Sequence, residues 1–272
     1  ETTCKGATQP LTIGGSGDNI VVDIDNSTIT SGDLGYAVII FNPVTMTIDN
    51  SSITGWSAVY FKQPSSSLGA AGSVCTINNS TLRGVNKASE HPSNAFATIA
   101  IQDNDIEVNV TGNSTIVYAD ETNSNSQCAF GIGGENITEQ LSNDLVINVA
   151  NGVTMEGHIL GFNDAQQLQD GANIVFPAEY ADELRAAGYI VEVVGNQVKV
   201  TDIAEDEAYI GTTYYETLEE AIAAANADDD EDEVVLLNDV TIESKIDVTK
   251  SLVLNGNNKT LTYTGSDRAI DV

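Results

Sequence analysis

One short phrase recurs along this chain and constrains its fold more than any other feature. An alternating apolar stretch is followed by asparagine, by small hydroxyl residues and by an aliphatic residue. The copies read VVDIDNSTIT at 21–30, TMTIDNSSIT at 45–54, VCTINNSTLR at 74–83, IEVNVTGNSTIV at 106–117 and, more loosely, LVINVANGVTM at 145–155. Copies 24 to 34 residues apart are typical of solenoid turns. The phrase therefore predicts short strands that stack in parallel on like strands.

The repeated asparagine predicts a tight corner in every turn. Asparagine tolerates the left-handed backbone conformation, and its amide can stack on the asparagine one turn above. The rival interpretation is glycosylation, because these asparagines begin Asn-X-Ser/Thr triplets: Asn26, Asn50, Asn78, Asn79, Asn109, Asn113, Asn136 and Asn258. We favour the corner, since a corner repeated for packing generates such triplets anyway.

Charge and hydropathy patterning exclude several classes of protein. Lys and Arg number 10 against 40 Asp and Glu, which gives a formal net charge of −30. That charge repels both a nucleic-acid backbone and an anionic lipid surface. No apolar run approaches the ~20 residues that a membrane-spanning helix needs. We therefore expect no nucleic-acid binding and no membrane insertion.

The cysteines and the chain ends carry weaker information. Three cysteines are too few for a scaffold built on disulfides. Cys75 and Cys128 alternate with apolar residues, so both should point into the interior, whereas Cys4 could be a free thiol or form an intermolecular bridge. Because the chain starts at Glu1 and stops at Val272 within solenoid-like sequence, it is either a natural mature subunit or a truncated piece of a longer protein.

The repeat is interrupted after residue 175. The stretch 176–203 predicts a small α/β cap or connector, with a short helical segment around Leu184 and alternating strands at 189–194 and 197–201. The predicted division is therefore parallel turns at 1–175, a cap-connector at 176–203, and a capping helix with the first turns of a second solenoid at 204–272.

The expected capping helix has clear boundary signals. Thr217 can cap its first turn, with Glu220 placed three residues later. Its apolar stripe consists of Leu218, Ala221, Ile222 and Ala225. The acidic run 228–233 should end the helix in a solvated loop, after which VVLLNDVTI begins a strand.

Three phrases in the last third of the chain carry a resemblance to a known family. YETLEEAIAAAN, EVVLLNDVTI and SLVLNGNNKTLT follow one another, and together they resemble the opening of pectate-lyase-like domains in surface proteins of Gram-positive gut bacteria. The resemblance implies an all-β fold, a right-handed parallel β-helix interrupted by a small α/β cap-connector and a capping helix. It also implies an extracellular or cell-surface location, and it says far less about activity.

The chain ends predict self-association. A solenoid cut open exposes unpaired backbone groups and an apolar cross-section, which can template further stacking. Residues 11–30 of another copy could supply the next turn after TYTGSDRAIDV, so copies would join head-to-tail into a filament. The expected interface consists of Leu11, Ile13, Val21 and Ile24 at the front and of Leu252, Leu254, Leu261, Tyr263, Ile270 and Val272 at the rear. The leading hypothesis is thus a structural or adhesive protein rather than an enzyme.

The runner-up is a carbohydrate-binding or polysaccharide-degrading protein that acts on host or cell-wall glycans. Its groove would be formed by the loops around Trp56, Tyr60 and Lys62, with Arg83 as a second basic residue. The paired carboxylates or basic residue that polysaccharide lyases and hydrolases need are not evident. We therefore predict no catalytic residue and no metal site.

Calcium is the one ion that the sequence makes worth considering. Asp103 and Asp105 flank Asn104, and six acidic residues stand together at 228–233. Carboxylates suit weak calcium binding, but the spacing is not diagnostic, and a charge run is usually a solvated loop. His158 lies among aliphatic residues in GHILG and is expected to be structural.

Overall fold

The computed structural model describes residues 2–5, 9–14, 20–31, 35–62, 69–85, 97–118, 128–133, 137, 139–163, 166–227 and 232–272. Over these residues the fold is mainly β, with long parallel sheets and few helical segments. The chain packs into two compact units. Unit 1 comprises Glu1–Ala181 and Glu192–Val200, and unit 2 comprises Asp182–Val191 and Thr201–Val272. The segment 176–203, expected as a separate connector, is divided between them.

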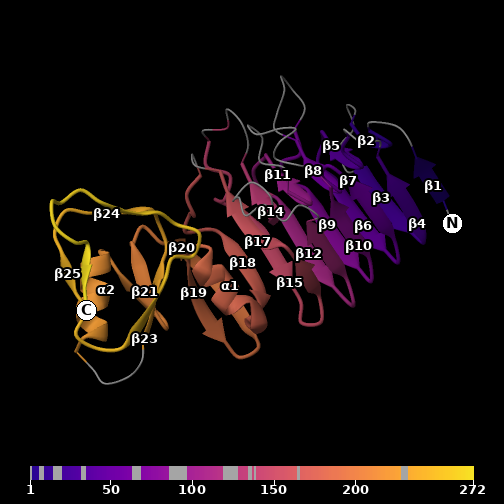
Figure 1. The fold of residues 1–272 in the computed structure, drawn as a ribbon. Helices are drawn as coiled ribbons and strands as arrows, with labels where there is room; N and C mark the ends of the chain where they lie inside the picture. Colours follow the sequence, from indigo (N-terminus) through magenta and orange to yellow (C-terminus); the bar gives the residue numbers. More distant parts are fainter. Residues whose placement is uncertain are drawn as a thin grey trace. The chain divides into compact units, whose positions relative to one another are not determined.

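Unit 1 contains three sheets that receive strands in rotation (Figure 1). Sheet A holds β1 (Thr2–Lys5), β4 (Ser27–Thr30), β7 (Ser52–Gly55), β10 (Thr81–Gly84), β13 (Thr115–Tyr118) and β16 (Thr154–Glu156). Sheet B holds β2 (Leu11–Ile13), β5 (Val38–Ile40), β8 (Val59–Phe61), β11 (Ile99–Ile101), β14 (Cys128–Ile132) and β17 (His158–Phe162). Sheet C holds β3 (Ile20–Asp25), β6 (Val44–Asp49), β9 (Val74–Asn78), β12 (Glu107–Thr111), β15 (Val146–Val149) and β18 (Asn173–Pro177).

All neighbouring strands among these eighteen are parallel, and each pairs with the strand three places away in the chain. Three consecutive strands, here called a triplet, therefore place one strand in each sheet. This arrangement explains why the phrase repeats in the sequence. Each triplet needs one period-two stretch for sheet C and a second short one for sheet A, so like residues return at the same register position.

Columns of apolar side chains fill the interior of unit 1. In sheet C, one column runs in register through Ile24, Ile48, Ile77, Val110 and Val149, and all five are buried. Burying one such side chain contributes about 1.5–3 kcal/mol. The predicted inward cysteines behave as small apolar residues in this interior, since Cys75 and Cys128 are both buried and neither forms a disulfide.

The predicted asparagine corner lies between sheets C and A. Asn26, Asn50 and Asn79 adopt positive φ angles of 46°, 46° and 45°, the left-handed conformation that asparagine tolerates better than most residues. The stacking of their side-chain amides from turn to turn stays a prediction. Asn26 and Asn50 donate to the preceding carboxylates, Asp25 and Asp49.

Buried serines make the turn-to-turn connection at this corner. The Ser27 amide donates to Ser51 Oγ at 3.0 Å, the Ser51 amide donates to Ser80 Oγ at 3.0 Å, and the Ser80 amide donates to Ser114 Oγ at 3.2 Å. We call this series the serine ladder. The left-handed residue turns these amides away from their usual partners in a sheet, and the ladder gives each of them an acceptor. Buried N–H groups need such an acceptor.

Sheet C continues differently after β18. The strand β20 (Gln197–Ile203) pairs antiparallel with β18, and β19 (Tyr189–Val194) follows it in the sheet. The predicted connector strands at 189–194 and 197–201 correspond to these two elements. The helical segment expected around Leu184 consists of a 3₁₀ turn, η1 (Ala178–Tyr180), and α1 (Ala181–Ala186).

Unit 2 repeats the parallel arrangement on a smaller scale. Its elements are β21 (Ala208–Ile210), β22 (Thr213–Tyr215), α2 (Leu218–Ala225), β23 (Asp232–Leu236), β24 (Val240–Ile242), β25 (Ile246–Asp247), β26 (Leu252–Asn255), β27 (Leu261–Tyr263) and β28 (Ile270–Asp271). The triplet β23–β25 pairs in parallel with the final triplet β26–β28. The hairpin β21–β22 is antiparallel and extends the first of these sheets.

The expected capping helix is α2. Thr217 Oγ1 accepts from the Glu220 amide at 3.2 Å, which confirms the predicted N-cap. The predicted stripe is buried in full: Leu218, Ala221, Ile222 and Ala225. These side chains pack with buried residues of β23 and β24, so α2 fills the interior beside the first triplet of unit 2. Within the described residues, no helix is both long and apolar enough to cross a membrane.

Candidate functional site

The most distinctive surface of unit 2 is the C-terminal edge, defined as the outer edges of β26, β27 and β28. Each of these strands ends its sheet in the described part of the chain, so one side of each backbone has no strand partner there. A row of unpaired amides and carbonyls is a site for strand addition. Three such rows around one cross-section make a surface that suits another parallel triplet.

The inward side chains of the C-terminal edge are only partly covered. Leu254, Leu261, Tyr263 and Ile270 point inward but are partly exposed. Their in-register partners are all buried: Val234, Val240, Ile242 and Ile246. The same interior position is therefore covered in one triplet and open in the next.

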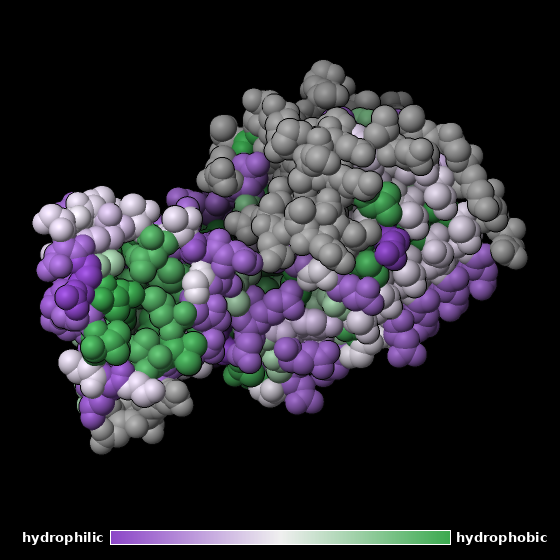
Figure 2. All heavy atoms as spheres, in the orientation of Figure 1, coloured by the Kyte–Doolittle hydropathy of each residue, from purple (hydrophilic) through white to green (hydrophobic). Residues whose placement is uncertain are grey.

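A shallow apolar depression lies at this edge. It has a volume of about 320 Å³ and is lined chiefly by Ile222, Leu252, Leu254, Ile270 and Val272. Figure 2 shows apolar side chains gathered over the C-terminal unit on the face turned to the viewer. Val272 is 100% exposed. Four of the six rear residues predicted from the sequence thus line one depression, and Leu261 and Tyr263 pack against the same core.

The corresponding N-terminal edge is formed by β1, β2 and β3, which end sheets A, B and C. Leu11 is partly exposed, while Ile13 and Ile24 are buried. Val21 is 67% exposed, because its register position faces outward from sheet C while Ile20 and Val22 face inward. Sequence periodicity could have found this difference, since Ile24 and Val21 cannot point to the same side of one strand.

Trp56 and Tyr60, the aromatic residues of the predicted carbohydrate groove, belong to a packed cluster of rings. Trp56 and Tyr60 are only 5% and 4% exposed. The Tyr36 ring lies 4.5 Å from that of Tyr60 and 6.4 Å from that of Trp56. Lys62 Nζ lies 5.5 Å from the Tyr60 ring centre, within range of a cation–π contact.

Burial dominates the electrostatics of this aromatic cluster. It raises the pKa of Tyr36 to about 12 and that of Tyr60 further, so both hydroxyls are neutral over the physiological range. The Tyr60 hydroxyl donates to Gln102 Oε1. Rings held in this way stabilise unit 1 and offer little open face for a sugar. Arg83 lies exposed on β10, and no described contact joins it to the cluster. A glycan groove stays a prediction.

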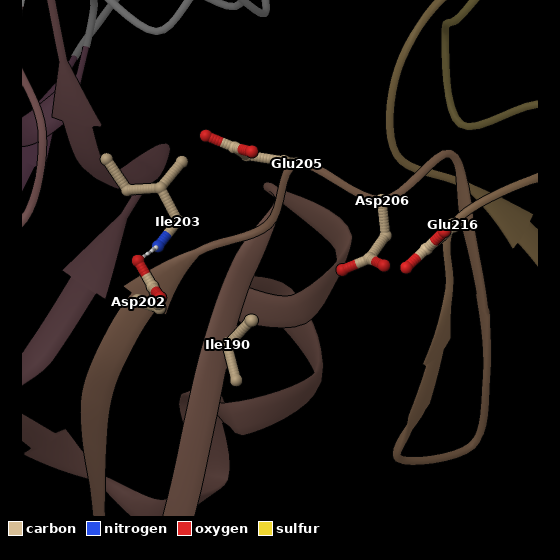
Figure 3. A pocket seen from close by; sticks show the side chains of 6 residues that line it. All are labelled: Ile190, Asp202, Ile203, Glu205, Asp206 and Glu216. Atoms are coloured by element: carbon tan, nitrogen blue, oxygen red, sulfur yellow. Dashed lines mark hydrogen bonds between the residues drawn. The ribbon is translucent and has the colours of Figure 1, made fainter.

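An acidic depression of about 560 Å³ lies in unit 2 (Figure 3). Asp202, Glu205, Asp206 and Glu216 line it, with Ile190 and Ile203 as apolar neighbours. The Asp206 and Glu216 side chains project toward one another, whereas Glu205 points elsewhere. Within the described residues, no three metal-ligating side chains converge tightly enough to hold an ion. The depression therefore has the charge but not the geometry of a metal centre.

The predicted calcium ligands have other partners. The Asp103 carboxylate is buried and accepts from the amides of Ala71 at 3.0 Å and Asn104 at 2.8 Å. Burial raises the pKa of this carboxyl, and the hydrogen bonds from backbone amides oppose the rise. Asp105 occupies a left-handed turn with φ of 51°. In the acidic run, 228–231 lie outside the described residues, and weak calcium binding stays a prediction.

His158 begins β17 and is half-buried opposite Cys128 in sheet B.

Comparison with known proteins adds no relative from which a role could be carried over. The structural features above consequently stand as the basis for a functional assignment. No family model, no curated protein and no solved structure matches the chain.

Proposed function

We propose that the protein is a structural module wound as a right-handed parallel β-helix, in which each triplet is one turn. The rotation of strands through sheets A, B and C supports this winding. The right-handed sense follows from the strong preference of connections between parallel strands. A module of this kind acts through the stiffness of its stacked turns and through the molecules that its ends and loops bind.

We further propose that copies stack head-to-tail into filaments through their edges. The observation that carries this proposal is the C-terminal edge, where three strand edges without a partner in the described residues surround a partly exposed apolar depression. A contact between this edge and a different edge of the next copy is heterologous, so it repeats without closing. The resemblance to bacterial surface proteins favours an extracellular, structural or adhesive setting for such filaments.

Sedimentation and negative-stain electron microscopy over a range of protein concentrations test the proposal. The parent chain is expected to form unbranched filaments that grow with concentration. Ile270→Asp should abolish them, because a carboxylate would then lie in the apolar cross-section of the edge. Val193→Asp is the matched control, since Val193 is a comparably apolar, 45% exposed residue on β19.

Circular dichroism of both variants checks that the fold is kept. Filaments of unchanged length in a folded Ile270→Asp variant would contradict the proposed interface. Uniform single particles of the parent chain at every concentration would contradict self-association itself.

A further inference from the structure

We propose that a second copy docks its first triplet on the final triplet in one defined register, with β1 on β26, β2 on β27 and β3 on β28. This inference rests on the head-to-tail stacking proposed above. It commits to a second copy as the occupant of the C-terminal edge, and four observations support that choice.

The two triplets have the same strand spacing. β1, β2 and β3 begin at Thr2, Leu11 and Ile20, while β26, β27 and β28 begin at Leu252, Leu261 and Ile270. Both sets therefore advance by nine residues and then by nine again. The neighbouring triplet β23–β25 begins at 232, 240 and 246 and does not share this spacing. The starts of the three strands in the two triplets are thus related by one constant offset of 250 residues.

The two triplets also share part of their sequence. Residues 2–22 and 252–272 align without a gap, and the identical pairs are Gly6 and Gly256, Leu11 and Leu261, Thr12 and Thr262, Gly15 and Gly265, Ser16 and Ser266, Ile20 and Ile270, and Val22 and Val272. Three of these pairs are the apolar residues that each triplet needs inside. The C-terminal edge thus presents the same side chains that the N-terminal edge would bring to it.

The identical residues also point to the same side of their strands in the two triplets. Leu11 pairs with buried Val38, and Leu261 pairs with buried Val240. Ile20 pairs with Val44 and Ile270 with Ile246, which are buried too. Because side chains alternate along a strand, the proposed register puts the inward residues of β2 and β3 over inward residues of β27 and β28. A shift of one residue would reverse this match along the whole strand.

In unit 1, neighbouring turns place buried apolar residues of similar kind directly over one another. In sheet A, Ile53 lies in register between Ile29 and Leu82, and all three are buried. The proposed docking would extend this rule between copies, with Leu11 over Leu261 and Ile20 over Ile270. The strand order also preserves the winding, since the turn that follows β28 must begin on β26.

Disulfide trapping with single-cysteine chains tests the register. Thr12 and Thr262 are exposed and outward-facing, and neighbouring strands would bring their Cα atoms to about 4.8 Å, within disulfide range. Two further threonines, Thr260 and Thr264, lie two residues to either side and would be about 8 Å from residue 12, beyond that range. All chains carry Cys4→Ala, and the remaining Cys75 and Cys128 are buried.

The Thr12→Cys chain is mixed in turn with Thr260→Cys, Thr262→Cys and Thr264→Cys chains and oxidised mildly. The covalent dimer is expected to be at least five-fold more abundant with Thr262→Cys than with either neighbour. Neither Thr12→Cys nor Thr262→Cys should dimerise alone, since the contact is heterologous.

A maximum at Thr260→Cys or Thr264→Cys would overturn the register, and a dimer of Thr12→Cys alone would overturn the head-to-tail polarity. Either result would leave self-association standing, because the parent chain's sedimentation reports that separately. A parent chain that never associates would instead remove the proposed function on which the register rests.

Discussion

The serine ladder predicts that one buried hydroxyl in unit 1 is costly to remove. Ser80 is 2% exposed, and its Oγ accepts from the Ser51 amide at 3.0 Å while donating to the Asn78 carbonyl at 2.8 Å. In Ser80→Ala the carbonyl keeps a donor, the Asn50 amide at 3.2 Å. The Ser51 amide, in contrast, loses its acceptor at a buried position.

A buried N–H group without an acceptor costs about 1–3 kcal/mol, and we expect Ser80→Ala to lower the free energy of unfolding of unit 1 by that amount. Urea unfolding is followed by fluorescence of Trp56, the single tryptophan of the chain, which is buried in unit 1. With a slope of about 2 kcal/mol/M, the midpoint should fall by roughly 0.5–1.5 M.

The matched control for this experiment is Ser52→Ala. Ser52 stands on β7 two positions from the corner, and its side chain is exposed. Exposed substitutions usually stay within about 0.5 kcal/mol of the parent. If Ser80→Ala were as stable as Ser52→Ala, the ladder would not carry the stability assigned to it.

Three further predictions follow from the described contacts. Asn50→Ala should destabilise unit 1 by about 1–2 kcal/mol more than Asn50→Gly in the same urea assay. Both variants lose the hydrogen bond to Asp49, but only alanine resists a φ of 46°. Equal urea midpoints for the two variants would refute this. Thr217→Ala should cost α2 about 1 kcal/mol and speed hydrogen exchange of its amides roughly five-fold, with exposed Thr241→Ala as the unchanged control. Unit 1 should lose stability as pH rises from 10 toward 12, because the unfolded chain releases tyrosine protons near ~10 while burial raises the Tyr36 pKa to about 12. A Tyr36→Phe chain should show a shallower pH dependence of the urea midpoint, and an unchanged slope would contradict the assignment.

Local signals in the sequence predicted several elements correctly. The Thr217 cap and the stripe Leu218 to Ala225 appear as α2, because capping and helical periodicity act within one turn. The Asn26, Asn50 and Asn79 corners adopt the expected left-handed conformation, since that preference belongs to the residue itself.

Features that depend on packing between turns were harder to predict. Trp56 and Tyr60 were expected to line a groove, but their rings pack on Tyr36 and are buried. Composition could not reveal this, because an aromatic residue suits a sugar platform and a packed cluster equally well.

The serine ladder and the matching triplets did leave a signal in the sequence. A serine follows each of the four asparagines of the repeated phrase, at 27, 51, 80 and 114. The seven identical pairs between residues 2–22 and 252–272 need only an alignment of the chain with itself. What the sequence lacked was the register, which shows that these residues lie at equivalent positions.

The corners of unit 1 differ in how much new sequence they can take. Asn26 alone connects β3 to β4, and the serine ladder ties the first four sheet C to sheet A corners together. The connections from sheet A to sheet B vary widely, from Gly157 alone to the stretch between Gly84 and Ile99. An insertion at the first corner would break a shared line of hydrogen bonds, whereas the connection from sheet A to sheet B already differs in length from turn to turn, so an insertion there costs little. Such a chain can therefore acquire new recognition sequences in the connections from sheet A to sheet B, while the corners from sheet C to sheet A preserve its architecture. The connections from sheet A to sheet B are also the place to graft a peptide for display.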